Sequence, residues 1–157
     1  MTIDEALLQK LASWRPDSVS NRLSVDHAGS GWQVNLVAEH VDTLGCRLSE
    51  LTLSRLRPLG EGRSLADQAG RIAGRVTGLL EPLRLVEVDA EHGVAQLRST
   101  SAARRGDDLA YYEVLRHGDG TTRVHRYQTA PGGKRHAIAF TLTHEALAKL
   151  VGDLTAS

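Results

Sequence analysis

The stretch 109-LAYYEVLRHGDGTTRVHRYQT-129 decides the fold that we predict for this chain. It contains two runs of residues typical of strands, 109–116 and 122–129, on either side of a short segment that ends in Asp119-Gly120. An Asp-Gly pair between two such runs is a strong signal for a β-hairpin, because both residues tolerate the backbone of a tight turn. The stretch therefore predicts two antiparallel strands.

The register of this hairpin depends on where its turn lies. A two-residue turn at Asp119-Gly120 would set Tyr112 opposite Tyr127, which is a favourable cross-strand pair. The same turn would set Arg116 opposite Arg123, and two like charges in that position destabilise a sheet. The register therefore stays open.

The rest of the chain extends this pattern to a whole sheet with helices. Apolar residues with helical spacing predict helices over 3–14, over 64–80 and from 143 onward. Runs with strand character cover 23–27, 32–40, 46–57, 83–89, 94–99 and 134–141. The connections are mostly of hairpin length, so the order α-βββ-α-βββββ-α predicts an α+β fold in which the helices pack on a mainly antiparallel sheet. We expect residues 1–157 to form one such domain.

This order of elements is similar to that of the small secretion chaperones, in which a helix, three strands, a helix, further strands and a helix follow one another. The similarity concerns fold order alone, because no sequence motif accompanies it. The chain departs from that pattern in its three extra strands and in its neutral sequence pI of about 7.1. It supports an adaptor or chaperone-like role by analogy only.

The central helix carries three glycines spaced four residues apart, Gly70, Gly74 and Gly78. Each glycine inside a helix costs on the order of 1 kcal/mol relative to alanine, so a stripe of three needs a compensating reason. Close approach of another backbone would supply that reason, because glycine has no Cβ. We favour tight contact between this helix and the sheet, and the alternative is a helix–helix seam in a homodimer.

Composition excludes several classes of protein. The 157 residues have a formal net charge of zero and are 41% hydrophobic, which is not the composition of a disordered chain. No apolar run reaches the roughly 18 residues of a membrane span. Only 4% of residues are aromatic, so nucleic acid is not a favoured partner. Sixteen of the 19 basic residues are arginine, a bacterial-like bias that a GC-rich genome produces without any function.

Cysteine usage and the acidic N-terminus point to a cytosolic protein. Cys46 is the single cysteine, which excludes an intramolecular disulfide, and no secretory signal precedes the first helix.

Catalytic and metal-binding motifs are not found in the sequence. Cys46 opposite His40 is the one cysteine–histidine pair that the expected register brings together, and a small apolar role for Cys46 is favoured. His125 and His136 lie on neighbouring strands, but no carboxylate or further histidine has metal-ligand spacing with them. We therefore expect no catalytic residue, no metal and no cofactor, and we lean against an enzyme.

The strongest functional signal is an uneven distribution of charge. Residues 93–140 hold eight basic and four acidic groups, so the neutral total conceals a segment of net charge +4. A solvated sheet surface with cross-strand ion pairs would explain this segment without any function. The functional interpretation is a site for an acidic protein segment or an anionic small ligand. Its candidate residues are Arg98, Arg104, Arg105, Arg116, Arg123, His125 and Tyr127.

These observations favour a non-catalytic protein-binding module that is cytosolic and homodimeric. The alternative is a small-molecule or anionic-ligand-binding protein, or an enzyme, with a pocket between the sheet and the central helix. Tyr112, His125 and Tyr127 would supply the polar groups of that pocket if they share one sheet face.

Overall fold

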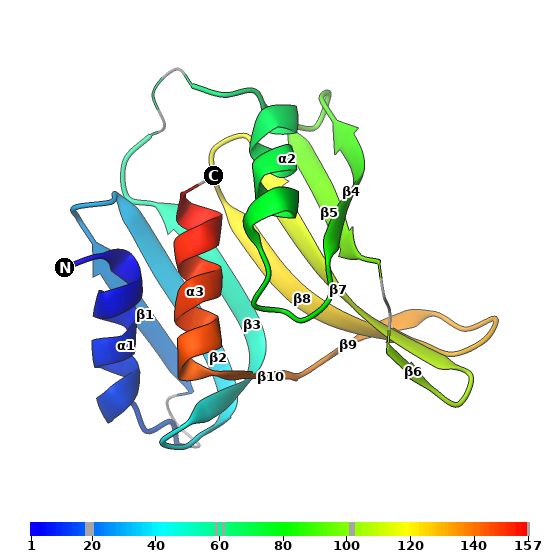
Figure 1. Ribbon diagram of the computed structural model, residues 1–157, viewed down its shortest axis with the longest axis horizontal. Coiled ribbons are helices and arrows are strands. Elements are labelled where there is room, and N and C mark those ends of the chain that lie inside the picture. The colour runs from blue at the N-terminus through cyan, green and yellow to red at the C-terminus, as the bar shows by residue number, and fades with distance from the viewer. Residues whose placement is uncertain (18–20, 59, 61, 101–102, 157) are drawn as a thin grey trace.

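The computed structural model describes residues 1–17, 21–58, 60, 62–100 and 103–156, and within these ranges it contains three helices and a ten-stranded antiparallel sheet (Figure 1). The helices are α1 (Ile3–Ser13), α2 (Leu65–Arg75) and α3 (His144–Thr155). The strands are β1 (Arg22–His27), β2 (Trp32–Val41), β3 (Gly45–Arg55), β4 (Leu83–Asp89), β5 (Val94–Ser99), β6 (Ala103–Arg105), β7 (Asp108–His117), β8 (Thr122–Thr129), β9 (Arg135–Ile138) and β10 (Phe140–Thr143). The α+β prediction is confirmed. The expected last strand is divided into β9 and β10, and β6 lies in a stretch between 99 and 109 for which the sequence predicts no strand.

The sheet has the strand order β1-β2-β3-β8-β7-β5-β4. β3 pairs with β8 through Leu51–Leu53 and with β10 through the segment from Gly45 to Leu48. Because β9 pairs with β8, the chain from β9 to β10 enters between β3 and β8. Gly45 permits this close approach, since a Cβ there would lie 2.7 Å from the carbonyl oxygen of Leu142.

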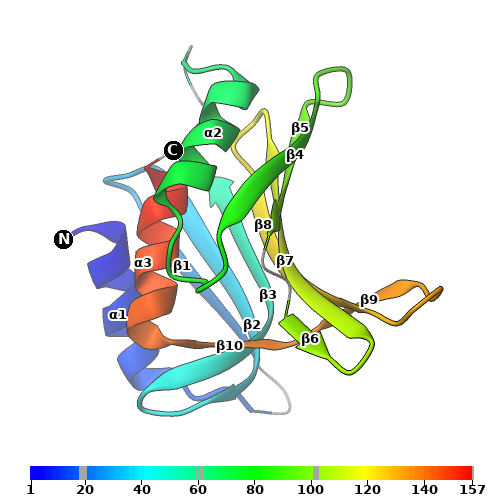
Figure 2. The same cartoon turned by 45° about the vertical axis from the view of Figure 1, so that its right-hand side comes forward.

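All three helices lie on the same face of the sheet (Figures 1 and 2). Val34, Leu53, Val124, Val114 and Leu97 follow one another across β2, β3, β8, β7 and β5 on this face, and each is fully buried. Helices α1 and α3 cover β1 and β3, whereas α2 contacts β4, β5 and β7. We call this side the helix face. None of the described helices lies on the other side, which we call the open face.

The hairpin from β7 to β8 has a register one residue away from the expected one. Gly120, with φ of +95°, donates its N–H to the carbonyl of His117, and the N–H of His117 bonds to the carbonyl of Thr121. This turn takes up one residue more than an Asp-Gly turn, in the manner of a type I turn followed by a bulge. As a result Tyr111, not Tyr112, lies opposite Tyr127.

This one-residue difference changes which side chains share a face. Tyr112 lies opposite Arg126 on the helix face, and Arg116 lies opposite Thr122 instead of Arg123. The unfavourable pair of arginines is therefore avoided. The prediction that Tyr112, His125 and Tyr127 could share one face is wrong, because strand side chains alternate between faces.

The central helix is shorter than predicted and does not pack through its glycines. It ends at Arg75, so Gly78 lies in the connection to β4, where a Cβ would lie 3.3 Å from the carbonyl oxygen of Ala146 in α3, and the expected close approach of another backbone holds at this glycine. Gly70 and Gly74 are exposed, and a Cβ built on either meets no atom within 4 Å. The helix instead buries Ala69 and Ile72 on its opposite side. None of the described helices is long and apolar enough to cross a membrane.

Replacing Gly70 or Gly74 by alanine is expected to raise the free energy of unfolding by on the order of 1 kcal/mol each, because both sites are open and alanine is the better helix former. Urea denaturation measures this change. Gly45→Ala is the control and should lower stability, since its Cβ would meet the Leu142 carbonyl. A loss of stability in Gly74→Ala would contradict the open space at this helix.

Candidate functional site

Five side chains from four neighbouring strands gather on the open face. Arg98 on β5 lies opposite Glu113 on β7, and Tyr111 on β7 lies opposite Tyr127 on β8. Arg135, at the start of β9, reaches across Tyr127 to the same group. We call these five residues the arginine–tyrosine cluster.

The centre of the cluster is the carboxylate of Glu113, which is only 2% exposed. Its Oε2 accepts hydrogen bonds from Arg135 Nη1 at 2.6 Å and from Gln96 Nε2 at 2.8 Å. Arg98 Nη2 lies 3.9 Å from the same oxygen. A buried carboxylate is stable only with such partners, so Glu113 fixes the positions of both arginines.

The two arginines also lie over the two tyrosine rings. The guanidinium carbon of Arg98 is 4.5 Å from the ring centre of Tyr111, and that of Arg135 is 4.0 Å from the ring centre of Tyr127. The two rings are 6.1 Å apart and tilted by 38°. Stacking, together with the hydrogen bond of Arg135 and the ion pair of Arg98 to Glu113, leaves each guanidinium group little rotational freedom. The hydrogen bond to Glu113 also raises the pKa of Arg135 above its ordinary value.

Further cations surround the cluster on the open face. Arg84 on β4 lies directly opposite Arg98, and Arg123 on β8 projects from the same face two residues before His125. Arg84 and Arg123 are exposed. Two arginines in direct cross-strand register repel each other, so an anion placed between them would be stabilising.

The structure divides the predicted site residues among three environments. Arg98, Arg123, His125 and Tyr127 share the open face. Arg104 is exposed, lies on the side of β7 that Leu109 shares with Tyr111 and lines a separate hollow, and the side chain of Arg105 lies outside the described part of the structure. The basic segment is therefore not one patch.

Arg116 is in the interior, so its prediction as a surface-binding residue is wrong. It is 1% exposed and points to the helix face, where it donates to Gln68 of α2, to Thr122 and to the carbonyl of Leu154 in α3. Burial, with a contribution from Arg55, lowers its pKa to about 10. Arg116 therefore joins both helices to the sheet.

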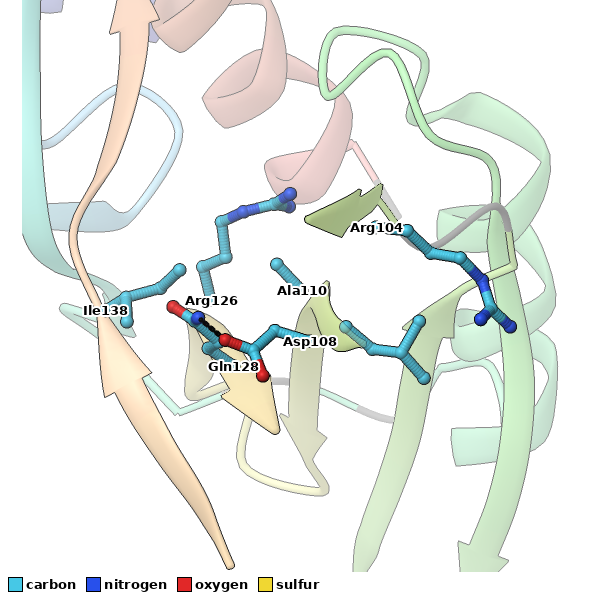
Figure 3. Close-up of a pocket in the computed structure, with 7 residues that line it drawn as sticks. Arg104, Asp108, Ala110, Arg126, Gln128 and Ile138 are labelled. Carbon is cyan, nitrogen blue, oxygen red and sulfur yellow. Dashed lines mark hydrogen bonds between the residues drawn. The ribbon is translucent and has the colours of Figure 1, made fainter. Parts of the chain in front are cut away.

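The hollow on the helix face has a volume of about 400 Å³ (Figure 3). Its lining residues are Arg104, Asp108, Leu109, Ala110, Arg126, Gln128 and Ile138. Gln128 donates to Asp108 at 3.0 Å, and Arg126 pairs with Glu81 at 3.0 Å while it lies over the ring of Tyr112. Figure 3 shows Arg104 pointing away from Arg126, so the two cations do not converge on one point.

The predicted pairing of Cys46 with His40 is wrong. Two irregularities in the ladder between β2 and β3 set His40 opposite Arg47 and Val41 opposite Cys46. Cys46 is 2% exposed, and burial raises the pKa of its thiol to about 11, with a smaller contribution from Asp42. The protonated thiol behaves as a small apolar side chain.

Metal binding gains no support from the described side chains, since no three of their His, Cys, Asp and Glu groups converge on a point where an ion could sit. His125 and His136, which were considered as a pair, lie on opposite faces, because His136 is opposite Gln128. Comparison with protein-family models, with curated proteins and with solved structures found no match. The site is therefore interpreted from its geometry alone.

Sequence reasoning missed the anchor of the cluster. Arg135 and Arg84 belong to segments with no special spacing, and a two-residue turn at Asp119-Gly120 would set Glu113 opposite Arg126, whereas it lies opposite His125. The run Tyr111-Tyr112-Glu113 was the available signal. It could be interpreted only with the correct register, because a shift of one residue exchanges the two faces.

We expect Cys46 to react slowly with iodoacetamide at pH 8. A pKa raised from 9.0 to about 11 leaves about 100-fold less thiolate than in the unfolded chain. The same shift stabilises the fold below pH 9, and this contribution is lost as the pH rises from 9 towards 11. Mass spectrometry of the alkylated protein measures the rate, with a urea-unfolded sample as the control. Equal rates in both samples would show that Cys46 is accessible.

Proposed function

We propose that this protein is a non-catalytic, adaptor or chaperone-like module that holds an acidic segment of a partner protein against its open face. The observation that carries the proposal is the concentration of Arg84, Arg98, Arg123 and Arg135 on one uncovered sheet face. The guanidinium group of arginine has two parallel N–H donors that match the two oxygens of a carboxylate. Arginine side chains that are already held in place lose little conformational entropy on binding.

The environment of Glu113 supports binding over catalysis. Its carboxylate is buried and bonded to Arg135 and Gln96, so it is engaged in holding the cluster together. A general base needs a carboxylate within reach of a substrate proton. We assign Glu113 a positioning role.

A cytosolic location and a homodimer are part of this proposal. Gly70 and Gly74 leave open space along α2, which a helix from a second copy could approach closely.

A second candidate function is binding of a small ligand in the hollow on the helix face. Its volume of about 400 Å³ falls within the range of ligand sites, and Ala110 and Ile138 give it apolar surface. Two of its polar groups, Gln128 and Asp108, already bond to each other, and Arg126 is paired with Glu81, which does not line the hollow; we therefore rank it second.

The double variant Arg84→Glu/Arg123→Glu is expected to weaken binding of a fluorescent peptide of alternating glutamate and serine by about tenfold or more, because two attractive charges become repulsive. Fluorescence anisotropy at 50 and 150 mM salt measures the affinity. Arg63→Glu/Arg71→Glu, with Arg63 just before α2 and Arg71 on it, is the matched control, since both residues are exposed and the change in net charge is the same. Ala110→Trp, which fills the hollow, should leave the affinity unchanged.

Equal weakening by the two charge-reversing variants would mean that only net charge matters, and would contradict a binding face. Loss of peptide binding in Ala110→Trp would favour the hollow. Sedimentation of the same samples at tens of micromolar tests the dimer, which a purely monomeric species would exclude.

A further inference from the structure

The two arginines of the cluster form a pair of donors that is already aligned. Arg135 Nη1 and Arg98 Nη2 lie 2.6 Å and 3.9 Å from one oxygen of Glu113, so the two guanidinium groups are neighbours around a single atom. Each lies over its own tyrosine ring, and each side chain remains 41% exposed. Glu113 and the tyrosine rings hold the two guanidinium groups from the side of the sheet. The outer edge of each guanidinium group, on the side away from the sheet, faces solvent.

These outer edges keep donor capacity for a ligand. A guanidinium group has five N–H donors, and the hydrogen bonds of Arg135 to Glu113 and Tyr111 both leave from Nη1. The Nε of Arg98 is buried and has no hydrogen-bond partner within the described part of the chain, so the donors that Arg98 can offer to a ligand are those of its terminal nitrogens. A group with several acceptor oxygens could therefore bridge the two arginines.

The local charge indicates which group fits. Arg84, Arg98 and Arg135 bring three positive charges, and Glu113 and Glu87, which lies opposite Gln96 on the same face, bring two negative charges, so these five groups carry a net charge of +1. A single carboxylate would balance this charge but offers only two acceptor oxygens to two guanidinium groups. A phosphate monoester carries about −1.5 to −2 at pH 7 and has three strong acceptor oxygens.

We propose that Arg98 and Arg135, with Arg84 beside them, bind the phosphate of a phosphorylated side chain on the partner segment. This inference rests on the proposed function and specifies the group that the open face recognises. A phosphate attached to a peptide suits the site better than a free phosphate ion does, because Arg123 extends the positive surface beyond the reach of one ion.

Three labelled peptides of one acidic sequence test this inference, with phosphoserine, glutamate or serine at the central position. We expect the phosphoserine peptide to bind about tenfold more tightly than the glutamate peptide, because bidentate contacts to phosphate are stronger. Arg98→Lys keeps the charge but removes the fork, and should abolish this preference. Arg123→Lys is the matched control outside the cluster and should retain it.

The outcomes separate the two proposals. If the glutamate peptide binds as tightly as the phosphoserine peptide, the phosphate site is overturned and the acidic-segment function stands. If none of the three peptides binds, both proposals fail. Displacement of the phosphoserine peptide by inorganic phosphate at a concentration near the peptide's own Kd would overturn the assignment to a side-chain phosphate. Loss of the preference in Arg123→Lys as well would remove the special role of the arginine pair.

Discussion

The hydrogen bond between Glu113 and Arg135 is the interaction on which the open face depends. It joins β7 to β9 across β8, and the bond from Gln96 adds β5, so one carboxylate connects three strands that are distant in sequence. Burial of a carboxylate is costly, and two short hydrogen bonds offset that cost. Without Glu113, Arg98 and Arg135 would repel each other over the tyrosines. The same contact thus holds the β9 segment on the sheet and orients the proposed binding groups.

The two faces of the sheet are stabilised by different interactions. On the helix face, aliphatic side chains from alternate strand positions pack beneath three helices, and Arg116 is satisfied there by groups from α2, α3 and β8. On the open face, no described helix covers the strands, so polar and aromatic side chains cover one another. Stacked arginines lie over both tyrosine rings, and Tyr111 and Glu113 are buried there without an apolar layer. A face stabilised in this way keeps its charged groups accessible to a partner.

The sequence predicted the kind and order of the elements well, because hydrophobic periodicity and turn residues act locally. It did not predict the register of the β7–β8 hairpin, which depends on one extra residue in the turn around Gly120. The extra turn residue determines which side chains form the candidate site. With the observed register, Arg116 lies in the core and Tyr111 lies on the open face. The glycines of α2 were misinterpreted for a different reason. A missing Cβ permits close packing but does not require it, and Gly70 and Gly74 face open space.

A double-mutant cycle between Glu113 and Arg135 tests the central claim most directly. The free energy of unfolding in urea would be measured for Glu113→Gln, for Arg135→Met and for the double variant, with the exposed pair Glu39–Arg47 as the reference cycle. The account predicts a coupling energy of at least about 1 kcal/mol between Glu113 and Arg135, and a much smaller one for the exposed pair. If the effects of Glu113→Gln and Arg135→Met add within about 0.3 kcal/mol, the carboxylate does not hold the cluster together and the account is wrong.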